Sequence, residues 1–296
     1  MTVYDPFCRS GELLTGLAAR ARDEEPGTVL KLYGVSPNAE SLAFAEMNAT
    51  LHRRDHDFKL LRAEELLSSP PTGDRFEFIL ANPPFNMVTQ TSREPREWPF
   101  GPPPLKNANF AWLQHIVERL APDGRAAVIM PNGALFTANL HERHIRAEMV
   151  EAGCVEALIS LPTGLFRHTG IAVTVWMLAP PTPGRTEILF IDASSPGSIR
   201  HDLPAGQVER ITGAVREWRR GGIPQEVDAI AVSLAGVRER DYNLSPAIFL
   251  AQSSSAGADG DAISNIRAIA GRLEDQHRQA AESDALVAQM LKRLTS

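Results

Sequence analysis

Residues 2–14 read Thr2-Val-Tyr-Asp-Pro-Phe-Cys-Arg-Ser-Gly-Glu-Leu-Leu14. The apolar start predicts a short strand ending at Asp5, and the small residues after it predict a tight loop that leads into a helix. Ligands of open α/β sheets bind at the carboxyl ends of the strands, where such a loop lies. Small residues let the backbone approach a cofactor, and a helix N-terminus favours a carboxylate. An ordinary turn with one glycine has the same pattern, so this segment indicates the fold class but leaves the function open.

Short apolar runs alternate with helical patterns as far as residue 191, which is typical of βαβ units and a parallel sheet. We expect strands at 2–5, 29–33, 58–61, 76–81, 126–130, 155–160, 172–178 and 188–191. Clear helices are expected at 38–51, with Asn38 as N-cap, and at 109–120, followed by a turn at residues 122–124. The predicted fold class is α/β, a mostly parallel twisted sheet with helices on both faces.

We expect a first domain at 1–192, the candidate for any catalytic domain, a C-terminal extension at 193–252, a linker at 253–260 that its composition indicates, and a helical tail at 261–296. Proline-rich stretches at 93–106 and 179–185 predict irregular segments, the first a long exposed loop that is either a surface insertion or a flap beside the active site. Residues 263–294 predict one long helix, with apolar residues seven apart at Ile266, Leu273, Ala280, Val287 and Leu294. The second seam of this heptad pattern is not apolar, so a regular coiled coil is not indicated. We expect this helix to dock on a partner subunit, with packing on its own domain as the alternative.

The tetrapeptide Asn82-Pro83-Pro84-Phe85 directly follows the apolar strand predicted at 76–81. One group that such a turn can activate is a planar exocyclic amine, such as that of adenine. This amine is a poor nucleophile because its lone pair is delocalised into the ring. The Asn82 side-chain oxygen and the Pro83 carbonyl can each accept one N–H hydrogen bond and so direct that lone pair toward a methyl donor, without a metal. The two prolines restrict the loop, and Phe85 offers a face on which an extruded base can stack. A planar amide would suit the same device, so these residues leave the substrate open.

Further blocks resemble the N6-adenine DNA methylases, and most closely the modification subunits of type I restriction-modification systems. The likeness begins with the segments around Asp5 and Asn82 and includes Leu32-Tyr33-Gly34, Ala43, Met47-Asn48 and Leu51-His52. It continues through residues 109–111, 124–128, 131–136, 161–166, 169–171, 190–193 and 241–246, and so covers the chain from residue 2 to about residue 248.

This resemblance implies a Rossmann-like class I methyltransferase fold with S-adenosylmethionine as the cofactor. Its methionine end would lie near Asp5 and Pro6, beside the backbone of Cys8, Arg9, Ser10 and Gly11. Ser36, followed by Pro37, stands at the ribose-binding position, and Glu64 matches the acidic position that contacts the cofactor's adenine ring. The catalytic tetrapeptide matches Asn82, Pro83, Pro84 and Phe85, and Asn82 also borders the cofactor.

Three features depart from the family pattern. Arg9 stands where glycine is usual, which narrows the conformations open to that loop and crowds the cofactor. Ser36 stands where an acid normally grips both ribose hydroxyls, and it lacks a charge-assisted bond typically worth about 1.5–3 kcal/mol. The likeness starts at the first motif, so the helical N-terminal domain of the type I subunits has no counterpart here. We therefore expect either a second polypeptide that completes the catalyst or weakened cofactor binding.

Charge and composition limit the partners. A protein that grips DNA alone usually carries a basic face, whereas this chain has a formal net charge of −6. If the substrate is DNA, we therefore expect another subunit to supply much of the grip. The resemblance implies that this partner is a separate specificity subunit, with a second methylase or a restriction subunit as a further partner. Cys8 and Cys154 lie far apart and in no metal-ligand spacing, so no metal is expected. The sequence shows neither a secretion signal nor a run of roughly 20 apolar residues, and we expect a cytoplasmic protein with no membrane partner.

The leading hypothesis is methyl transfer to the N6 amine of adenine in DNA. One alternative is methylation of RNA or of a protein glutamine, and another is a catalytically silent scaffold that assembles a complex or holds DNA, as Arg9 and Ser36 suggest. We assign no general base, because an amine loses its proton readily once it is alkylated. Surface positions are therefore expected for the four histidines His115, His141, His144 and His168, and a core position for Cys154.

Overall fold

The computed structural model describes residues 1–68, 73–88, 96–166, 170–194 and 203–255. The chain divides into two compact units, Met1–Ala247 and Ile248–Ser296. No helix within the described ranges combines the length and the apolar character that a bilayer crossing requires.

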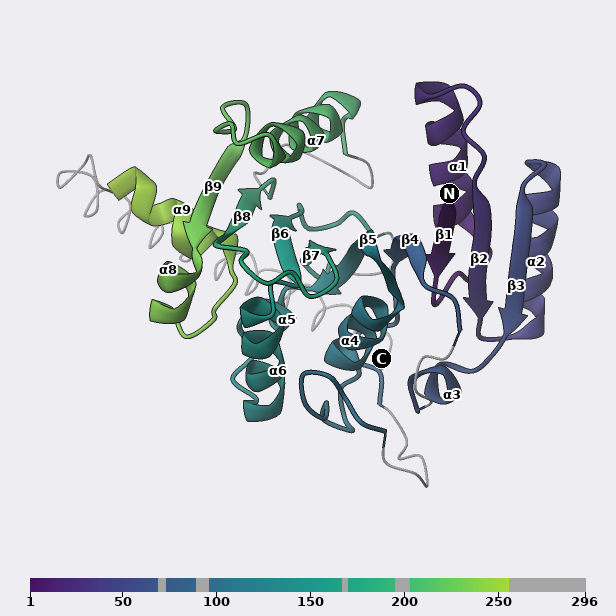
Figure 1. The fold of residues 1–296 in the computed structure, drawn as a ribbon, viewed down its shortest axis with the longest axis horizontal. Helices are drawn as coiled ribbons and strands as arrows, with labels where there is room; N and C mark the ends of the chain where they lie inside the picture. Colours follow the sequence, from purple (N-terminus) through teal and green to yellow (C-terminus); the bar gives the residue numbers. More distant parts are fainter. Residues whose placement is uncertain (69–72, 89–95, 167–169, 195–202, 256–296) are drawn as a thin grey trace, which may run out of the picture. The chain divides into compact units, whose positions relative to one another are not determined.

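One sheet of nine strands organises the first unit, in the order β3-β2-β1-β4-β5-β7-β6-β8-β9 (Figure 1). Most neighbouring pairs are parallel, whereas β7 runs antiparallel to β5 and β6, and β9 runs antiparallel to β8. The strands are β1 Thr2–Asp5, β2 Lys31–Ser36, β3 Asp55–Leu60, β4 Phe76–Ala81, β5 Leu120–Pro131, β6 Val155–Ser160, β7 Val173–Leu178, β8 Glu187–Asp192 and β9 Asp228–Ser233. The α/β class and the mostly parallel sheet are confirmed.

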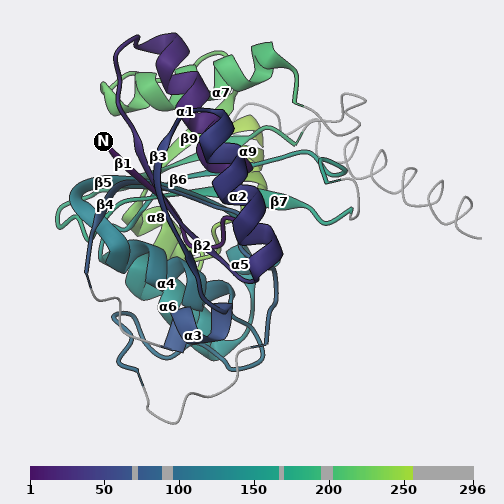
Figure 2. The same ribbon diagram turned by 90° about the vertical axis from the view of Figure 1, so that its right-hand side faces the viewer.

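Helices cover both faces of this sheet. Figure 2 shows α1, α2 and α7 on one face and α3, α4 and α6 on the other. The helices are α1 Glu12–Glu24, α2 Ala39–Leu51, α3 Ala63–Ser68, α4 Asn109–Arg119, α5 Gly133–Phe136, α6 Leu140–Glu151, α7 Ala205–Arg219, α8 Leu234–Glu239 and α9 Pro246–Ser255. Because both faces are covered, every residue of the central strand β6 is buried.

The chain reverses its direction of winding between β1 and β4. From β1 it proceeds outward through β2 to β3, and it then returns to place β4 on the other side of β1. Val3 of β1 pairs with Phe78 of β4, and Tyr4 pairs with Ile79. The two parallel strands therefore end together, with Asp5 beside the loop that begins at Asn82. Ligands bind outside such a switch point in open α/β sheets.

Several predicted elements are confirmed. The strands β1, β4 and β6 have the bounds expected from their apolar runs. The Asn38 side chain caps α2 by accepting a hydrogen bond from the Ser41 N–H at 2.8 Å. Cys154 is buried, as expected of a core thiol.

Other boundaries were wrong where polar residues form strands at the sheet edges. β3 begins at Asp55 rather than residue 58, because its first three residues are polar, and the other edge strand, β9, was missed, because its apolar run is only Ala229-Ile230-Ala231-Val232. β2 starts at Lys31, since Val29 is exposed. The turn expected at residues 122–124 lies within β5, where the register with β4 shifts between Phe76 and Phe78.

The expectations for the proline-rich and C-terminal segments met mixed outcomes. Within 96–106, Phe100 is buried and its N–H donates to Gln114 Oε1 at 3.0 Å, so this part packs on α4 and is not the fully exposed loop predicted. Residues 253–255 of the expected linker belong to α9. The remaining linker residues and the helix predicted at 263–294 lie outside the described residues. Residues 193–247 belong to the same compact unit as residues 1–192, since β9 pairs with β8.

Candidate active site

The loop between β1 and α1 carries the first group of predicted residues. Asp5 ends β1 and is only 1% exposed, and its Oδ1 accepts the Phe7 N–H at 2.9 Å. Burial is the main cause that raises the pKa of the Asp5 carboxyl to about 7, although the Phe7 hydrogen bond and the Arg9 charge oppose it. Pro6 is buried and Ser10 is half-buried.

Two hydrogen bonds and one close contact shape this loop. The Cys8 N–H donates to the Val35 carbonyl at 2.8 Å, and the Gly11 N–H donates to the Cys8 carbonyl at 2.6 Å. Gly11 is left-handed, with φ 78°, and a Cβ there would lie 3.5 Å from Ala45. The loop therefore approaches α2 closely at the start of α1. Arg9 is also left-handed, with φ 46°, a conformation that glycine adopts without steric cost.

Ser36 does not face an open site. Its side chain is fully buried, and its hydroxyl donates to the Arg9 carbonyl at 3.3 Å. This placement leaves no hydroxyl free for a ribose. Pro37 follows at half-buried depth, before α2 begins.

Glu64 lies in the first turn of α3, with 34% of its side chain exposed. Its Oε2 is 3.7 Å from Arg62 Nε, a loose ion pair between accessible groups. The carboxylate therefore stays available to a ligand beyond the ends of β2 and β3, since an exposed pair of this kind is weak.

The second group of predicted residues begins where β4 ends. Pro83 is buried, whereas Asn82, Pro84 and Phe85 are partly exposed. The Asn82 side chain has no hydrogen-bond partner recorded among the described residues, while its backbone carbonyl accepts from Arg9 Nη2 at 3.2 Å. The Phe85 ring meets Phe166 edge-on, with centroids 6.4 Å apart and an interplanar angle of 85°. The two predicted groups are therefore joined by the Arg9 contact.

Sequence reasoning missed the residues that anchor the second loop. Asn86 is left-handed, with φ 53°, and its N–H donates to Asn109 Oδ1 at 2.9 Å. The Asn109 amide donates back to Asn86 Oδ1 at 2.9 Å, and the Ala108 N–H donates to the Met87 carbonyl at 2.8 Å. An asparagine after Pro-Pro-Phe and another at the start of a helix were the available signal, because asparagine tolerates left-handed turns.

Aromatic packing places α4 behind both loops. The Phe7 ring meets Trp112 edge-on, with centroids 5.9 Å apart. His115 is buried on the same helix, which corrects its expected surface position, and burial lowers its pKa to about 3. Its ring is therefore neutral and 3.5 Å from the Tyr4 hydroxyl. His141 and His144 are exposed as expected, and His168 lies outside the described residues.

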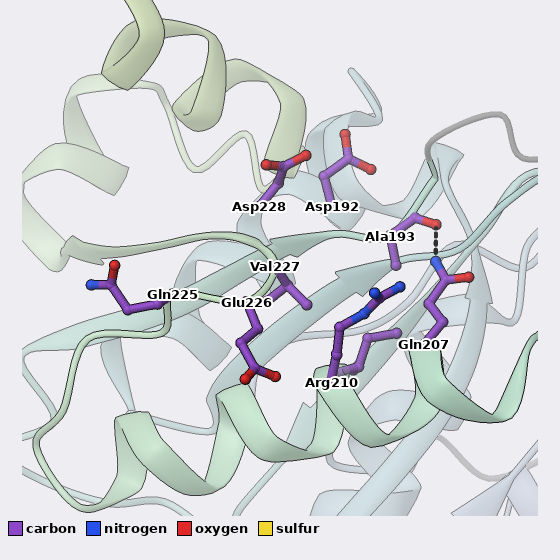
Figure 3. A pocket seen from close by; sticks show the side chains of 9 residues that line it. Asp192, Ala193, Gln207, Arg210, Gln225, Glu226, Val227 and Asp228 are labelled. Atoms are coloured by element: carbon purple, nitrogen blue, oxygen red, sulfur yellow. Dashed lines mark hydrogen bonds between the residues drawn. The ribbon is translucent and has the colours of Figure 1, made fainter.

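A separate hollow was not foreseen from the sequence. An open pocket of about 350 Å³ lies where β8 ends and β9 begins, beside α7. Figure 3 shows its polar lining, which includes Asp192, Gln207, Arg210, Glu226 and Asp228. It shares no lining residue with the predicted site. In the part of the chain that the structure describes, no three His, Cys, Asp or Glu side chains cluster closely enough to hold a metal ion.

The chain is similar to a known protein family and to several proteins in it. The family described as N-6 DNA Methylase matches residues 1–256. The chain belongs to this family. It is 27% identical to the type I restriction enzyme HindI methylase subunit of Haemophilus influenzae, across 96% of this chain and 66% of that protein.

Solved structures of family members have the same fold. A type I restriction-modification methyltransferase subunit from Streptococcus thermophilus superposes with a TM-score of 0.71 at 31% identity, covering 83% of this chain and 53% of that one. The type I restriction enzyme EcoKI M protein shares the fold with a TM-score of 0.62 at 18% identity, covering 86% of this chain and 65% of that one. The chain thus spans between half and two thirds of the length of these relatives. The Rossmann-like methyltransferase architecture is confirmed.

Proposed function

We propose that this chain transfers a methyl group from S-adenosylmethionine to the N6 amine of adenine in DNA, and that a separate specificity subunit chooses the site. The observation that carries this proposal is the position of Asn82 and Pro83. Both follow β4 directly and lie beside the Asp5 loop of β1, at the switch point of the sheet.

Two hydrogen-bond acceptors, on Asn82 and Pro83, act through the position and the partial negative charge of their oxygens. The Asn82 side-chain oxygen and the Pro83 carbonyl can each take one N–H of a planar amine, which concentrates the nitrogen lone pair on the face opposite these bonds. The partly exposed Phe85 ring can stack on a base turned out of the duplex. Anchoring through Asn86 and Asn109 limits movement of the loop between substrate binding and transfer.

The cofactor residues fit S-adenosylmethionine only in part. When bound, this cofactor supplies an electrophilic methyl group on a sulfonium. The left-handed turn at Gly11 suits its methionine end, and the accessible Glu64 carboxylate suits its adenine end, whereas the Asp5 carboxyl beside the methionine end is only 1% exposed. The buried Ser36 hydroxyl does not suit its ribose. We therefore expect weaker cofactor binding than an acid at this position would give.

Labelled S-adenosylmethionine offered separately with DNA, tRNA and protein tests the substrate class. We expect label in DNA alone, with a specificity subunit encoded nearby present in the reaction. If label appears only in RNA or only on protein glutamine, that molecule is the substrate and the proposal of DNA is wrong.

A second candidate function is a catalytically silent scaffold. Two observations favour it. The buried Ser36 hydroxyl cannot bind the cofactor ribose, and the contact between Arg9 and Asn82 places a guanidinium between the two loops. Calorimetric titration with S-adenosylmethionine separates the two functions. Absence of binding, with and without candidate partner chains, would support the scaffold.

A further inference from the structure

The loop of residues 82–85 has few hydrogen bonds of its own. Pro83 and Pro84 lack an N–H, so they cannot donate to neighbouring strands or loops. Among the described residues, one side-chain hydrogen bond to this tetrapeptide is recorded, from Arg9 Nη2 to the Asn82 carbonyl at 3.2 Å. The position of Asn82 therefore depends on Arg9, in the loop of residues 6–11 between β1 and α1, which we call the cofactor loop. Asn86 holds only the far end of the segment.

Arg9 reaches Asn82 from an unusual backbone conformation. Its φ of 46° is left-handed, which costs energy for any residue with a Cβ. The buried Ser36 hydroxyl donates to the Arg9 carbonyl at 3.3 Å, and the adjacent Cys8 N–H bonds to Val35 at 2.8 Å. The surrounding bonds thus hold Arg9 in a strained turn, as happens where strain serves a site.

Two of the three departures from the family pattern, Arg9 and Ser36, therefore form one structural unit. We propose that Arg9 is a positioning residue that ties the cofactor loop to Asn82, and that Ser36 holds Arg9 in place instead of binding the cofactor ribose. This inference rests on the proposed function, in which the Asn82 side chain and the Pro83 carbonyl hold the target amine. Fixing the Asn82 carbonyl fixes the origin of both acceptors, because Pro83 follows it by one rigid peptide unit.

Four variants of the full chain test this role. Arg9→Gly removes the guanidinium and relieves the left-handed strain, whereas Arg9→Lys keeps a charge that can still donate. Ser36→Ala removes the hydroxyl that holds the Arg9 carbonyl. Arg53→Gly is the matched control, since Arg53 is also left-handed, with φ 52°, and exposed, but it precedes the amino end of β3, whereas Arg9 follows the carboxyl end of the parallel strand β1.

We expect Arg9→Gly to lower kcat about tenfold, the low end for a hydrogen bond from a charged group, with KM for DNA changed less than about twofold. Its unfolding temperature should rise or stay level, because glycine relieves the strain. Arg9→Lys should recover part of kcat, and Ser36→Ala should lower it less than Arg9→Gly does. The control Arg53→Gly should stabilise the chain without changing kcat, which separates positioning from stability.

Hydrogen exchange at the amides of residues 85–87, in the free chain, makes the test independent of methyl transfer. Faster exchange in Arg9→Gly than in Arg53→Gly is the expected result. Equal exchange in these two variants would overturn the inference even if the wild type methylates DNA. An unchanged kcat in Arg9→Gly would also overturn it. If the wild type transfers no methyl group yet exchange is faster in Arg9→Gly, the tie between the loops stands and the proposed function fails.

Discussion

Asp5 ends β1 and Asn82 directly follows the neighbouring strand β4, but their surroundings differ. Asp5 is almost fully buried and accepts one backbone hydrogen bond, whereas Asn82 is partly exposed and its side chain has no partner recorded among the described residues. A buried carboxyl is structured before any ligand arrives, while an accessible amide oxygen can accept a hydrogen bond from a substrate. The two residues therefore suit different tasks in one site.

The buried Asp5 carboxyl makes stability depend on pH. Its folded pKa, raised from 3.8 to about 7, means that the folded chain holds this proton more tightly than the unfolded chain does. The contribution is present below about pH 4 and is lost as pH rises through 7, at a cost of at most about 4 kcal/mol. Asp5→Asn should therefore raise the unfolding temperature at pH 8 and lose this advantage toward pH 4. Thermal melts of both proteins across this range measure it, and a constant difference would contradict the assignment.

At the level of elements, the proposed site consists of two loops tied to two helices. Asn48 of α2 donates to the Ser10 carbonyl at 3.2 Å and so holds the cofactor loop. Asn109 of α4 exchanges hydrogen bonds with Asn86 and so holds the catalytic loop. Each helix thus supports one half of the proposed reaction.

Substitution of these two asparagines should separate the halves. Asn109→Ala leaves the Asn86 N–H without its acceptor, and we expect a loss of about 1–3 kcal/mol in stability together with a lower kcat. Asn48→Ala should instead weaken cofactor binding and leave kcat nearly unchanged at saturating cofactor. Steady-state kinetics and chemical denaturation of both variants provide the measurement. The same kinetic defect in both would show that the loops do not act separately.

Close packing between β2 and the cofactor loop requires Gly34. A Cβ at this position would lie 2.8 Å from Cys8 Sγ and 3.1 Å from the Phe58 ring. Gly34→Ala should therefore destabilise the chain by about 1–3 kcal/mol, and Cys8→Ala in the same chain should recover part of the loss by removing the sulfur. Denaturation curves of the single and double variants test this, and purely additive losses would argue against the contact.

Sequence patterns predicted the buried strands better than the edges and the contacts. β4 and β6 were found because each is mostly apolar, with one glutamate, and all of β6 is buried. β9 was missed because its apolar run, Ala229-Ile230-Ala231-Val232, is short and half of it is alanine, which has a low strand propensity. The residues of the proposed site were named from the sequence and remain a prediction. The Arg9–Asn82 bond and the hydrogen bond from the buried Ser36 to Arg9 join positions far apart in sequence, which no local pattern encodes.

The whole molecule is acidic, with a formal net charge of −6, and it spans between half and two thirds of the length of the three relatives described above. An acidic chain gains little from phosphate neutralisation. We therefore expect the chain alone to bind DNA no more tightly than about 1 µM at physiological salt, within the non-specific range. A specificity subunit should tighten binding at least tenfold in fluorescence anisotropy titrations. Nanomolar binding by the chain alone would contradict this division of labour.

The most direct test of the proposed chemistry is the identity of the methylated nucleoside. Unmethylated DNA is incubated with S-adenosylmethionine, the specificity subunit, and either the wild-type chain or Asn82→Ala, and is then digested for nucleoside mass spectrometry. We expect N6-methyladenine from the wild type and a loss of at least about a hundredfold in Asn82→Ala, because an acceptor used in the transition state is removed. Equal N6-methyladenine from both proteins, or methylation of another base, would contradict the account.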